Sequence, residues 1–177
     1  MRKLFSPHIT YAHDLWRAHL RPGDLAIDMT CGNGHDTALL CALGAGVIGF
    51  DIQPEAIAAT RLRAGNQPTL HLRSHAEILQ VPLPHPPRLI VFNLGYLPGG
   101  NKAVTTQTES TLDTLQKCLS ILAPDGAISI TCYPGHEEGL REMEAILQFV
   151  QTLTDWHVCH YQWVNRPRSP SLFWITS

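Results

Sequence analysis

A tight glycine turn constrains the fold of this chain more than any other feature of the sequence. It spans residues 28–36 and reads Asp-Met-Thr-Cys-Gly-Asn-Gly-His-Asp. An apolar run at 25–27 leads into the turn, and residues with helical spacing at 37–40 lead out of it. Glycine lets the backbone bend and approach a ligand closely because it has no Cβ. A strand, a tight turn and a helix in this order predict the entrance to a nucleotide-type cofactor site.

The spacing of the glycines distinguishes between cofactors. Asp28, Gly32 and Gly34 form the pattern Asp-x-x-x-Gly-x-Gly, which is typical of S-adenosylmethionine sites. A dinucleotide site would require Gly-x-Gly-x-x-Gly, and Thr37 stands where the third glycine belongs. The turn therefore favours S-adenosylmethionine and speaks against a dehydrogenase.

Strand and helix patterns alternate along the rest of the chain. The expected strands are 25–27, 46–51, 69–72, 88–93 and 127–132, followed by an antiparallel pair at 156–161 and 172–176. The expected helices are 8–20, one from 37, one from 54, 105–122 and 137–153. This alternation predicts a doubly wound α/β fold with a mostly parallel, seven-stranded, Rossmann-like sheet and an antiparallel C-terminal hairpin, as in class I methyltransferases. We expect one domain over 1–177, with a cofactor half at 24–80 and a substrate half at 88–177.

Two of the expected helices have an assignable inner face. Ile9, Ala12, Leu15, Trp16 and Leu20 fall on one face of helix 8–20. That helix either packs on the sheet or lies across the cofactor as a lid, and packing is favoured. In the helix opened by the proline at 54, the residues expected to face inward are Ala56, Ile57 and Leu62.

The cofactor half offers a ribose ligand and an adenine contact. Asp51 ends the second strand about 20 residues after the glycine turn, where a carboxylate accepts a pair of ribose hydroxyls. The alternative is an aspartate that caps the next helix. The loop after the third strand passes the adenine in this architecture, so His75 or Ala76 is a candidate contact. A loop histidine without a role is the alternative.

The substrate half is organised around Asn93. The buried run 88–93 delivers this residue to the carboxyl edge of the sheet, where ligands bind. Asn93 and Tyr96 resemble the Asn-Pro-Pro-Tyr of amino-group methyltransferases, in which an amide oxygen accepts hydrogen bonds from a nitrogen nucleophile. A plain turn with Tyr96 in the core is the alternative. His136 follows the fifth strand and either takes a proton or caps the next helix.

The composition of the chain limits its expected binding partners and its expected cellular compartment. The chain has 177 residues, of which 44% are hydrophobic, and a net charge of −2. This charge gives no indication of nucleic-acid binding, although a local basic patch would be compatible with it. Its five cysteines form no Cys-x-x-Cys pair, and its ten histidines lack metal-ligand spacing, so we expect free thiols and no metal. There is no signal peptide and no apolar run long enough to cross a membrane, which favours the cytoplasm.

Four segments resemble the bacterial family known as the rRNA methylases. They are residues 28–37, 49–53, 93–100 and 133–136, and the run Asn-Leu-Gly-Tyr-Leu-Pro-Gly-Gly at 93–100 is the most specific of them. That family is associated with methylation of the wobble uridine of tRNA. The resemblance implies conversion of 5-aminomethyl-uridine at position 34, often 2-thiolated, to 5-methylaminomethyl-uridine. It also implies the tRNA anticodon stem-loop as partner and suggests a homodimer.

The motifs and the resemblance together define three groups of site residues. The expected cofactor-binding residues are Asp28, Thr30, Gly32, Asn33, Gly34, His35, Asp36, Thr37, Asp51, Gln53, His75 and Asn93. The expected substrate-binding residues are Leu94, Gly95, Tyr96, Pro98, Gly99, Gly100, Tyr133, Pro134, Gly135, His136, Arg166 and Arg168. The expected catalytic residues are Asn93, Tyr96 and His136.

Three alternatives stay open at this point. The proton of the substrate amine goes to His136, to Asp36 or to bulk water. The substrate is alternatively rRNA or a small-molecule amine, because one fold serves many substrates. A non-catalytic cofactor- or RNA-binding module is the rival from another class, and the joint presence of Asp28, Asp51 and Asn93 argues against it.

Overall fold

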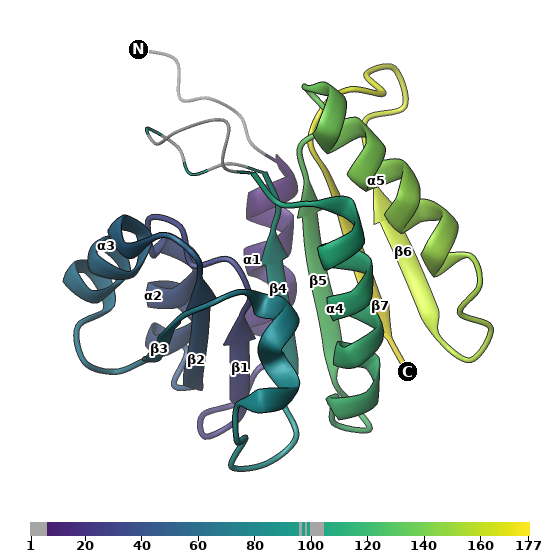
Figure 1. The fold of residues 1–177 in the computed structure, drawn as a ribbon. Coiled ribbons are helices and arrows are strands. Elements are labelled where there is room, and N and C mark those ends of the chain that lie inside the picture. Colours follow the sequence, from purple (N-terminus) through teal and green to yellow (C-terminus); the bar gives the residue numbers. More distant parts are fainter. Residues whose placement is uncertain (1–6, 96, 98, 100–104) are drawn as a thin grey trace.

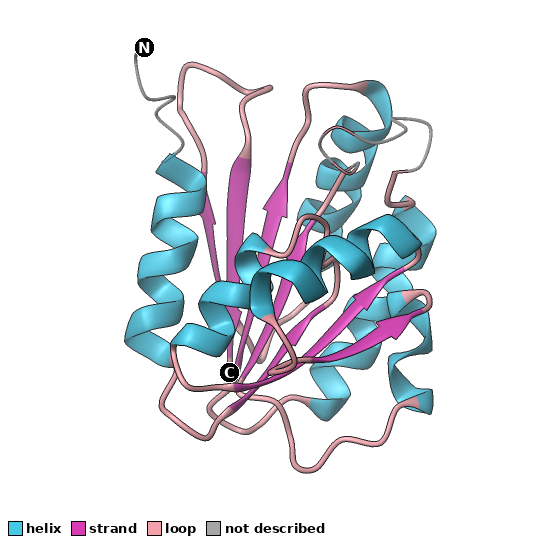
Figure 2. Cartoon of the chain, turned by 90° about the vertical axis from the view of Figure 1, so that its left-hand side faces the viewer, coloured by secondary structure: helices cyan, strands magenta, loops and turns pink. Residues whose placement is uncertain are grey.

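The fold is a seven-stranded sheet with helices on both faces (Figures 1 and 2). The computed structural model describes residues 7–95, 97, 99 and 105–177. The strands are β1 Leu25–Asp28, β2 Gly46–Asp51, β3 Thr69–Leu72, β4 Leu89–Asn93, β5 Ala127–Cys132, β6 His157–Tyr161 and β7 Ser171–Thr176. The helices are α1 Pro7–His19, α2 His35–Ala42, α3 Pro54–Ala64, the 3-10 helix η1 His75–Gln80, α4 Thr108–Ile121 and α5 Glu137–Val150.

The strand order is β3-β2-β1-β4-β5-β7-β6. Strands β1 to β5 pair in parallel, and β7 runs antiparallel between β5 and β6. The order reverses where β1 meets β4, so the carboxyl ends of these two strands diverge into helices on opposite sides. Such a switch point is where open α/β sheets bind ligands. The predicted doubly wound sheet with an antiparallel hairpin is confirmed.

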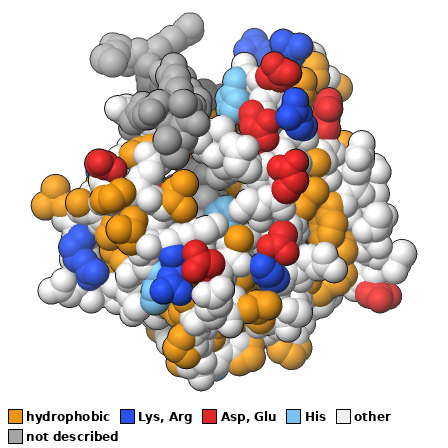
Figure 3. Space-filling view, viewed as in Figure 1, with side chains coloured by type: hydrophobic (Ala, Val, Ile, Leu, Met, Phe, Trp, Pro, Cys, Tyr) orange, Lys and Arg blue, Asp and Glu red, His pale blue; other side chains and the backbone are white. Residues whose placement is uncertain are grey.

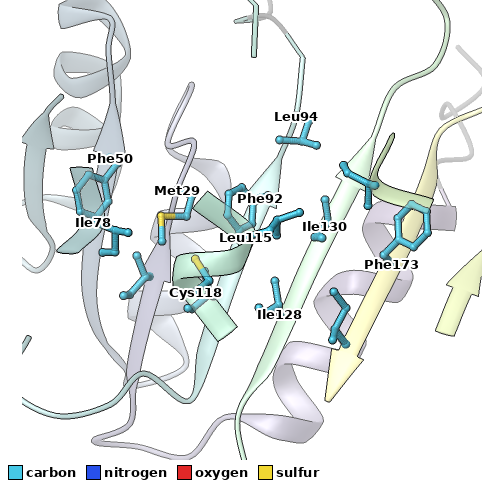
Figure 4. Close-up of a cluster of buried hydrophobic side chains, with 14 of the residues drawn as sticks. Met29, Phe50, Ile78, Phe92, Leu94, Leu115, Cys118, Ile128, Ile130 and Phe173 are labelled. Carbon is cyan, nitrogen blue, oxygen red and sulfur yellow. The ribbon is translucent and has the colours of Figure 1, made fainter. Parts of the chain in front are cut away.

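Alternate residues of the central strands fill two cores. In β4, Ile90 and Phe92 face one side of the sheet, and Leu89 and Val91 face the other. The first core packs against η1 and α4 (Figure 4) and against α5, and the second packs against α1 and α2. A strand that is buried on both faces has a continuous apolar sequence, and β4 could therefore be predicted from the sequence.

Helix α1 packs on the sheet, as predicted. Ala12, Trp16 and Leu20 are buried in the second core, and α1 lies against β5 and β7. The same helix also brings His13 to Asp36 of α2, at the predicted cofactor edge of the sheet.

The prediction that Leu62 faces inward was wrong. Leu62 is 90% exposed, and the buried face of α3 is formed by Ala56, Thr60 and Ala64. These residues recur at intervals of four along one face. They are small because α3 approaches the glycine turn closely.

Several element boundaries also differ from expectation. The region after β3, expected as a loop, forms η1, whose cap Ser74 accepts a hydrogen bond from the Ala76 amide. Helix α4 begins at Thr108 rather than 105, and α5 ends at Val150 rather than 153. The hairpin strands fall within one residue of their predicted ends.

Candidate active site

Asp28 stabilises the glycine turn through hydrogen bonds from inside the protein. Its carboxylate, 1% exposed at the end of β1, accepts hydrogen bonds from the Thr30 amide at 3.1 Å and the Thr37 hydroxyl at 2.5 Å. Burial, with a smaller contribution from the Asp36 charge, raises the pKa of Asp28 to about 7. Asp28 therefore shapes the cofactor turn from inside the protein.

Gly34 is required by close packing as well as by backbone conformation. It has a φ of +75°, and a Cβ placed on it would lie 2.6 Å from the Cα of Thr60 in α3. Gly32 has a φ of +52°, in the region that glycine adopts without strain. The two glycines let the turn bend while α3 packs against it.

Asp51 connects the end of β2 to the turn. Its Oδ2 accepts a hydrogen bond from the Gly32 amide and its Oδ1 accepts one from the Gln53 amide, both at 2.9 Å. The side chain is half-buried. A carboxylate has about four acceptor positions. Two backbone donors therefore leave acceptor capacity for a pair of ribose hydroxyls, so this group fits the role predicted for it.

Thr30 links the cofactor turn to the substrate half. Its hydroxyl accepts a hydrogen bond from the Asn93 amide nitrogen of the main chain at 2.7 Å. Because the Thr30 amide is itself bonded to Asp28, the ends of β1 and β4 are held in one arrangement. Asn93 thus stands at the switch point of the sheet, directly beside the glycine turn.

A chain of polar side chains surrounds Asn93. The Asn93 Nδ2 lies 3.0 Å from the Asp36 Oδ2, and the Asp36 Oδ1 lies 2.8 Å from the His13 Nε2. Tyr133 stands on the β5 side, and its ring meets that of His8 edge-on. Burial, together with the charge of Asp36, raises the pKa of Tyr133 to about 12. Four different elements or loops supply this group.

His136 caps helix α5, which is one of the two roles expected for it from the sequence. Its Nδ1 accepts a hydrogen bond from the Gly139 amide at 3.1 Å at the start of α5. The Nδ1 atom is therefore engaged in capping α5. Before it in the chain, Pro134 is buried and Gly135 is exposed, and both lie at the carboxyl edge of β5.

The predicted substrate loop is closed at its base. The Gly95 amide donates to the Thr106 hydroxyl at 3.0 Å, and the Thr106 amide donates to the Gly95 carbonyl at 3.1 Å. The Thr106 hydroxyl in turn donates to the buried Glu142 of α5 at 2.8 Å. Leu94 is buried in the first core, and Gly99 is exposed. Tyr96, Pro98 and Gly100 lie outside the described residues.

His75 is the first residue of η1, and its side chain packs against α4. Its Nδ1 is 2.8 Å from the Thr114 hydroxyl, and its ring meets Phe92 edge-on at 5.9 Å between centroids. Burial lowers the pKa of His75 to about 4, so the ring is neutral at physiological pH. The residue is thus a partly buried packing group rather than an exposed loop histidine.

The remaining predicted residues lie at the rim. His35 is exposed at the start of α2, and the carbonyl of Asn33 accepts a hydrogen bond from Arg63 at 2.9 Å. Arg166 and Arg168 are exposed in the segment between β6 and β7. That segment ends beside the carboxyl end of β5, because Ser171 pairs with Cys132.

Sequence reasoning missed His13, Thr106 and Glu142. His13 was detectable, since it stands four residues after Ile9 and three before Trp16, on the inward stripe of α1. Thr106 and Glu142 are 36 positions apart in the sequence, and no local sequence pattern predicts a contact between them.

Comparison with known proteins agrees with this geometry. The sheet order, the glycine turn and the polar group at the switch point define a class I methyltransferase. The chain belongs to the family described as "Putative rRNA methylase", whose model matches residues 47–177.

Three relatives are similar along almost the whole chain. The chain is 36% identical to the Arabidopsis thaliana protein named "tRNA (mnm(5)s(2)U34)-methyltransferase, chloroplastic", over 93% of this chain and 67% of that one. A structure titled "putative rRNA-methylase" from Clostridium thermocellum has a TM-score of 0.91 and 31% identity, covering 98% and 99% of the two chains. A Streptococcus mutans "putative methyltransferase" in complex with SAH has a TM-score of 0.88 and 34% identity, with the same coverage.

Proposed function

We propose that this enzyme methylates the primary amine of 5-aminomethyl-uridine, with or without 2-thiolation, at wobble position 34 of tRNA. One observation carries the substrate assignment: the likeness over 93% of the chain to a relative named as a tRNA U34 methyltransferase. The chemistry is supported independently by Asn93, an amide side chain placed at the switch point beside the cofactor turn.

The cofactor of the enzyme is S-adenosylmethionine, which supplies an electrophilic methyl group on a sulfonium when bound. The residues proposed to hold it are Asp51, for the ribose hydroxyls, and the turn from Thr30 to Gly34. The donor set fits, because Asp51 keeps acceptor capacity and the turn has no side chain at its two glycines.

The protein's part of the reaction is to bind and align a neutral amine. A primary alkylamine is mostly protonated at neutral pH, and only the free base attacks carbon. The ammonium form of the substrate would give its proton to solvent, and the lone pair of the neutral nitrogen would then attack the methyl group that the bound cofactor would supply as its electrophile, with the sulfur leaving as a neutral thioether. An amide oxygen at Asn93 accepts one N–H of the neutral amine and demands no positive charge, while the surrounding site excludes water.

The tRNA contact is proposed to involve Arg166 and Arg168. Both are exposed at the edge of the sheet where β4 and β5 end. Arginine is well suited to phosphate oxygens because it offers several donors in a fixed geometry. The face seen in Figure 3 carries interspersed acidic and basic side chains rather than one basic field. A second copy of the chain, forming a homodimer, is proposed as well and is tested by sedimentation.

Mass spectrometry of tRNA nucleosides tests this function. Purified enzyme and S-adenosylmethionine are incubated with three tRNAs whose wobble uridine carries aminomethyl, carboxymethylaminomethyl or no group. We expect one methyl group to be added to the aminomethyl nucleoside alone. Methylation of rRNA or of a free amine, with none on the aminomethyl tRNA, would replace this substrate with one of the rivals.

A further inference from the structure

We propose that His13 of α1 and Asp36 of α2 are positioning residues that fix the Asn93 amide with its oxygen turned toward the substrate amine. This inference rests on the proposed function for the identity of the amine. It gives the N-terminal helix a part in the reaction, through a contact between residues 23 positions apart in the chain.

The orientation of the Asn93 side chain follows from the chemistry of its neighbour. An ionised carboxylate only accepts hydrogen bonds, so the group facing Asp36 must be the NH2 of Asn93, 3.0 Å away. The amide oxygen is then turned away from Asp36, and Tyr133 is a second hydrogen-bonding neighbour of the Asn93 side chain. Without such a partner, the side-chain amide of an asparagine could rotate by 180° and present its NH2 to the substrate. An NH2 group is a donor, so it would repel an N–H of the amine where the amide oxygen would accept it.

Asp36 is itself held from the other side. The His13 Nε2, 2.8 Å from the second carboxylate oxygen, must carry the hydrogen in that contact. The side chains of His13 and Asp36 are 22% and 13% exposed, so water competes little for either. The position of Asp36 in the first turn of α2 also favours its negative charge.

Packing fixes His13 in turn. Its ring lies 4.9 Å from the ring of Trp16, which is 3% exposed in the core between α1 and the sheet. Ala12 and Trp16 hold that face of α1 against the strands. The chain of contacts therefore runs from the second core through His13 and Asp36 to the amide that touches the substrate.

A double-mutant cycle separates this role from proton transfer. In single-turnover assays with saturating S-adenosylmethionine, we expect Asp36→Ala and His13→Ala to slow methyl transfer by about 10- to 100-fold, as misalignment does. We expect RNA affinity to stay near wild type, and saturating cofactor keeps any loss of cofactor affinity in Asp36→Ala from entering the measured rate. Because Asp36 acts through Asn93, the Asp36→Ala/Asn93→Ala double variant should be no slower than Asn93→Ala alone. A double variant slower by the full factor of Asp36→Ala would overturn the proposal.

Conservative replacements and controls sharpen the result. His13→Gln keeps a donor for Asp36 and should recover most of the rate lost in His13→Ala. A glutamine variant as slow as the alanine variant contradicts the proposed hydrogen bond. Asp14→Ala, the next residue of α1, removes only an exposed pair with Arg17 and should leave the rate unchanged. His157→Ala, exposed at the start of β6, is the matched histidine control.

A spectroscopic readout keeps this inference independent of the substrate. The side-chain amide signals of Asn93, assigned by their loss in Asn93→Ser, should show slow hydrogen exchange in the wild type. Exchange should accelerate in Asp36→Ala and in His13→Ala. Unchanged exchange in both variants refutes the positioning role, whereas failure of wild-type turnover on the aminomethyl tRNA refutes only the proposed substrate.

Discussion

At the scale of single residues, Asp51 holds two backbone amides and is the proposed ligand of the cofactor ribose. It holds the amides of Gly32 and Gln53 and keeps acceptor capacity toward the site. We expect Asp51→Ala to weaken S-adenosylmethionine binding by roughly 1–3 kcal/mol, because hydrogen bonds to a charged group are removed. Calorimetry measures this change, with the exposed Asp155→Ala as control. Unaltered affinity in Asp51→Ala would remove the ribose assignment.

Asp28 couples the cofactor turn to pH. Its pKa in the folded protein is raised from 3.8 to about 7, so between these values the folded protein binds a proton that the unfolded chain has released. The stability that Asp28 contributes is therefore fully present below about pH 4 and is lost as the pH rises to about 7.

Asp28→Asn should remove this dependence, since an asparagine amide can still accept from the Thr30 amide and donate to Thr37. We expect the free energy of unfolding of the variant, relative to the wild type, to rise by on the order of a few kcal/mol between pH 4 and pH 8. Urea unfolding at a series of pH values measures the difference. Parallel curves for the two proteins would show that Asp28 does not titrate in this range.

At the scale of elements, the contact between α4 and α5 supports Thr106, which pairs with Gly95 at the base of the proposed substrate loop. The buried Glu142 accepts hydrogen bonds from Thr106 at 2.8 Å and from Thr111 at 2.6 Å. Burial raises the pKa of Glu142, against the two hydroxyl donors that lower it. Thr106 closes the loop through Gly95, so one carboxylate links α5 to the base of the loop.

Glu142→Ala leaves two hydroxyls without their acceptor and should lower the free energy of unfolding by about 1–3 kcal/mol. Turnover should fall further than stability explains, because the base of the substrate loop loses its anchor. Glu142→Gln should lose less, since its amide can pair with both hydroxyls. Denaturant unfolding and steady-state assays are compared with Glu144→Ala, an exposed glutamate of the same helix. A stability loss equal to that of Glu144→Ala would contradict the anchor.

The predictable elements are those with a strong local signal. Strand β4 and the glycine turn follow from a continuous apolar run and from fixed glycine spacing. The inward position of Ala56 was predicted, but the prediction for Leu62 was wrong because the buried face of α3 continues through Thr60, which packs closely on Gly34, and not through the largest apolar side chain. The short helix η1 has six residues and no period to detect. The sequence places the residues of the glycine turn close together because they belong to one motif. The pairing of His13 with Asp36 depends instead on how helices α1 and α2 pack on the sheet.

At the scale of the whole molecule, charge is spread rather than concentrated. A net charge of −2 gives no general attraction to nucleic acid, so any grip on tRNA depends on local cations. We found no helix among the described residues that is long and apolar enough to cross a membrane. The exposed pair Arg166 and Arg168 is therefore the sharpest place to test RNA contact.

Arg166→Ala and Arg168→Ala should weaken binding to the anticodon stem-loop and leave cofactor affinity intact. The slope of log affinity against log salt should fall by about 1 for each phosphate that the variant no longer binds. Fluorescence anisotropy at several salt concentrations measures both quantities. Arg61→Ala, exposed near the end of α3, should bind RNA like the wild type. Wild-type slopes in both loop variants would place the RNA elsewhere.

The insertion of β7 between β5 and β6 sets the order in which this protein can be completed during synthesis. Of the seven strands, β7 leaves the ribosome last, yet it occupies an interior position of the sheet and packs against α1, which precedes all seven strands in the sequence. Until β7 arrives, β5 has an open edge and α1 lacks part of its support. Helix α1, which carries His13 beside Asp36, therefore reaches its full packing only once β7 is in place.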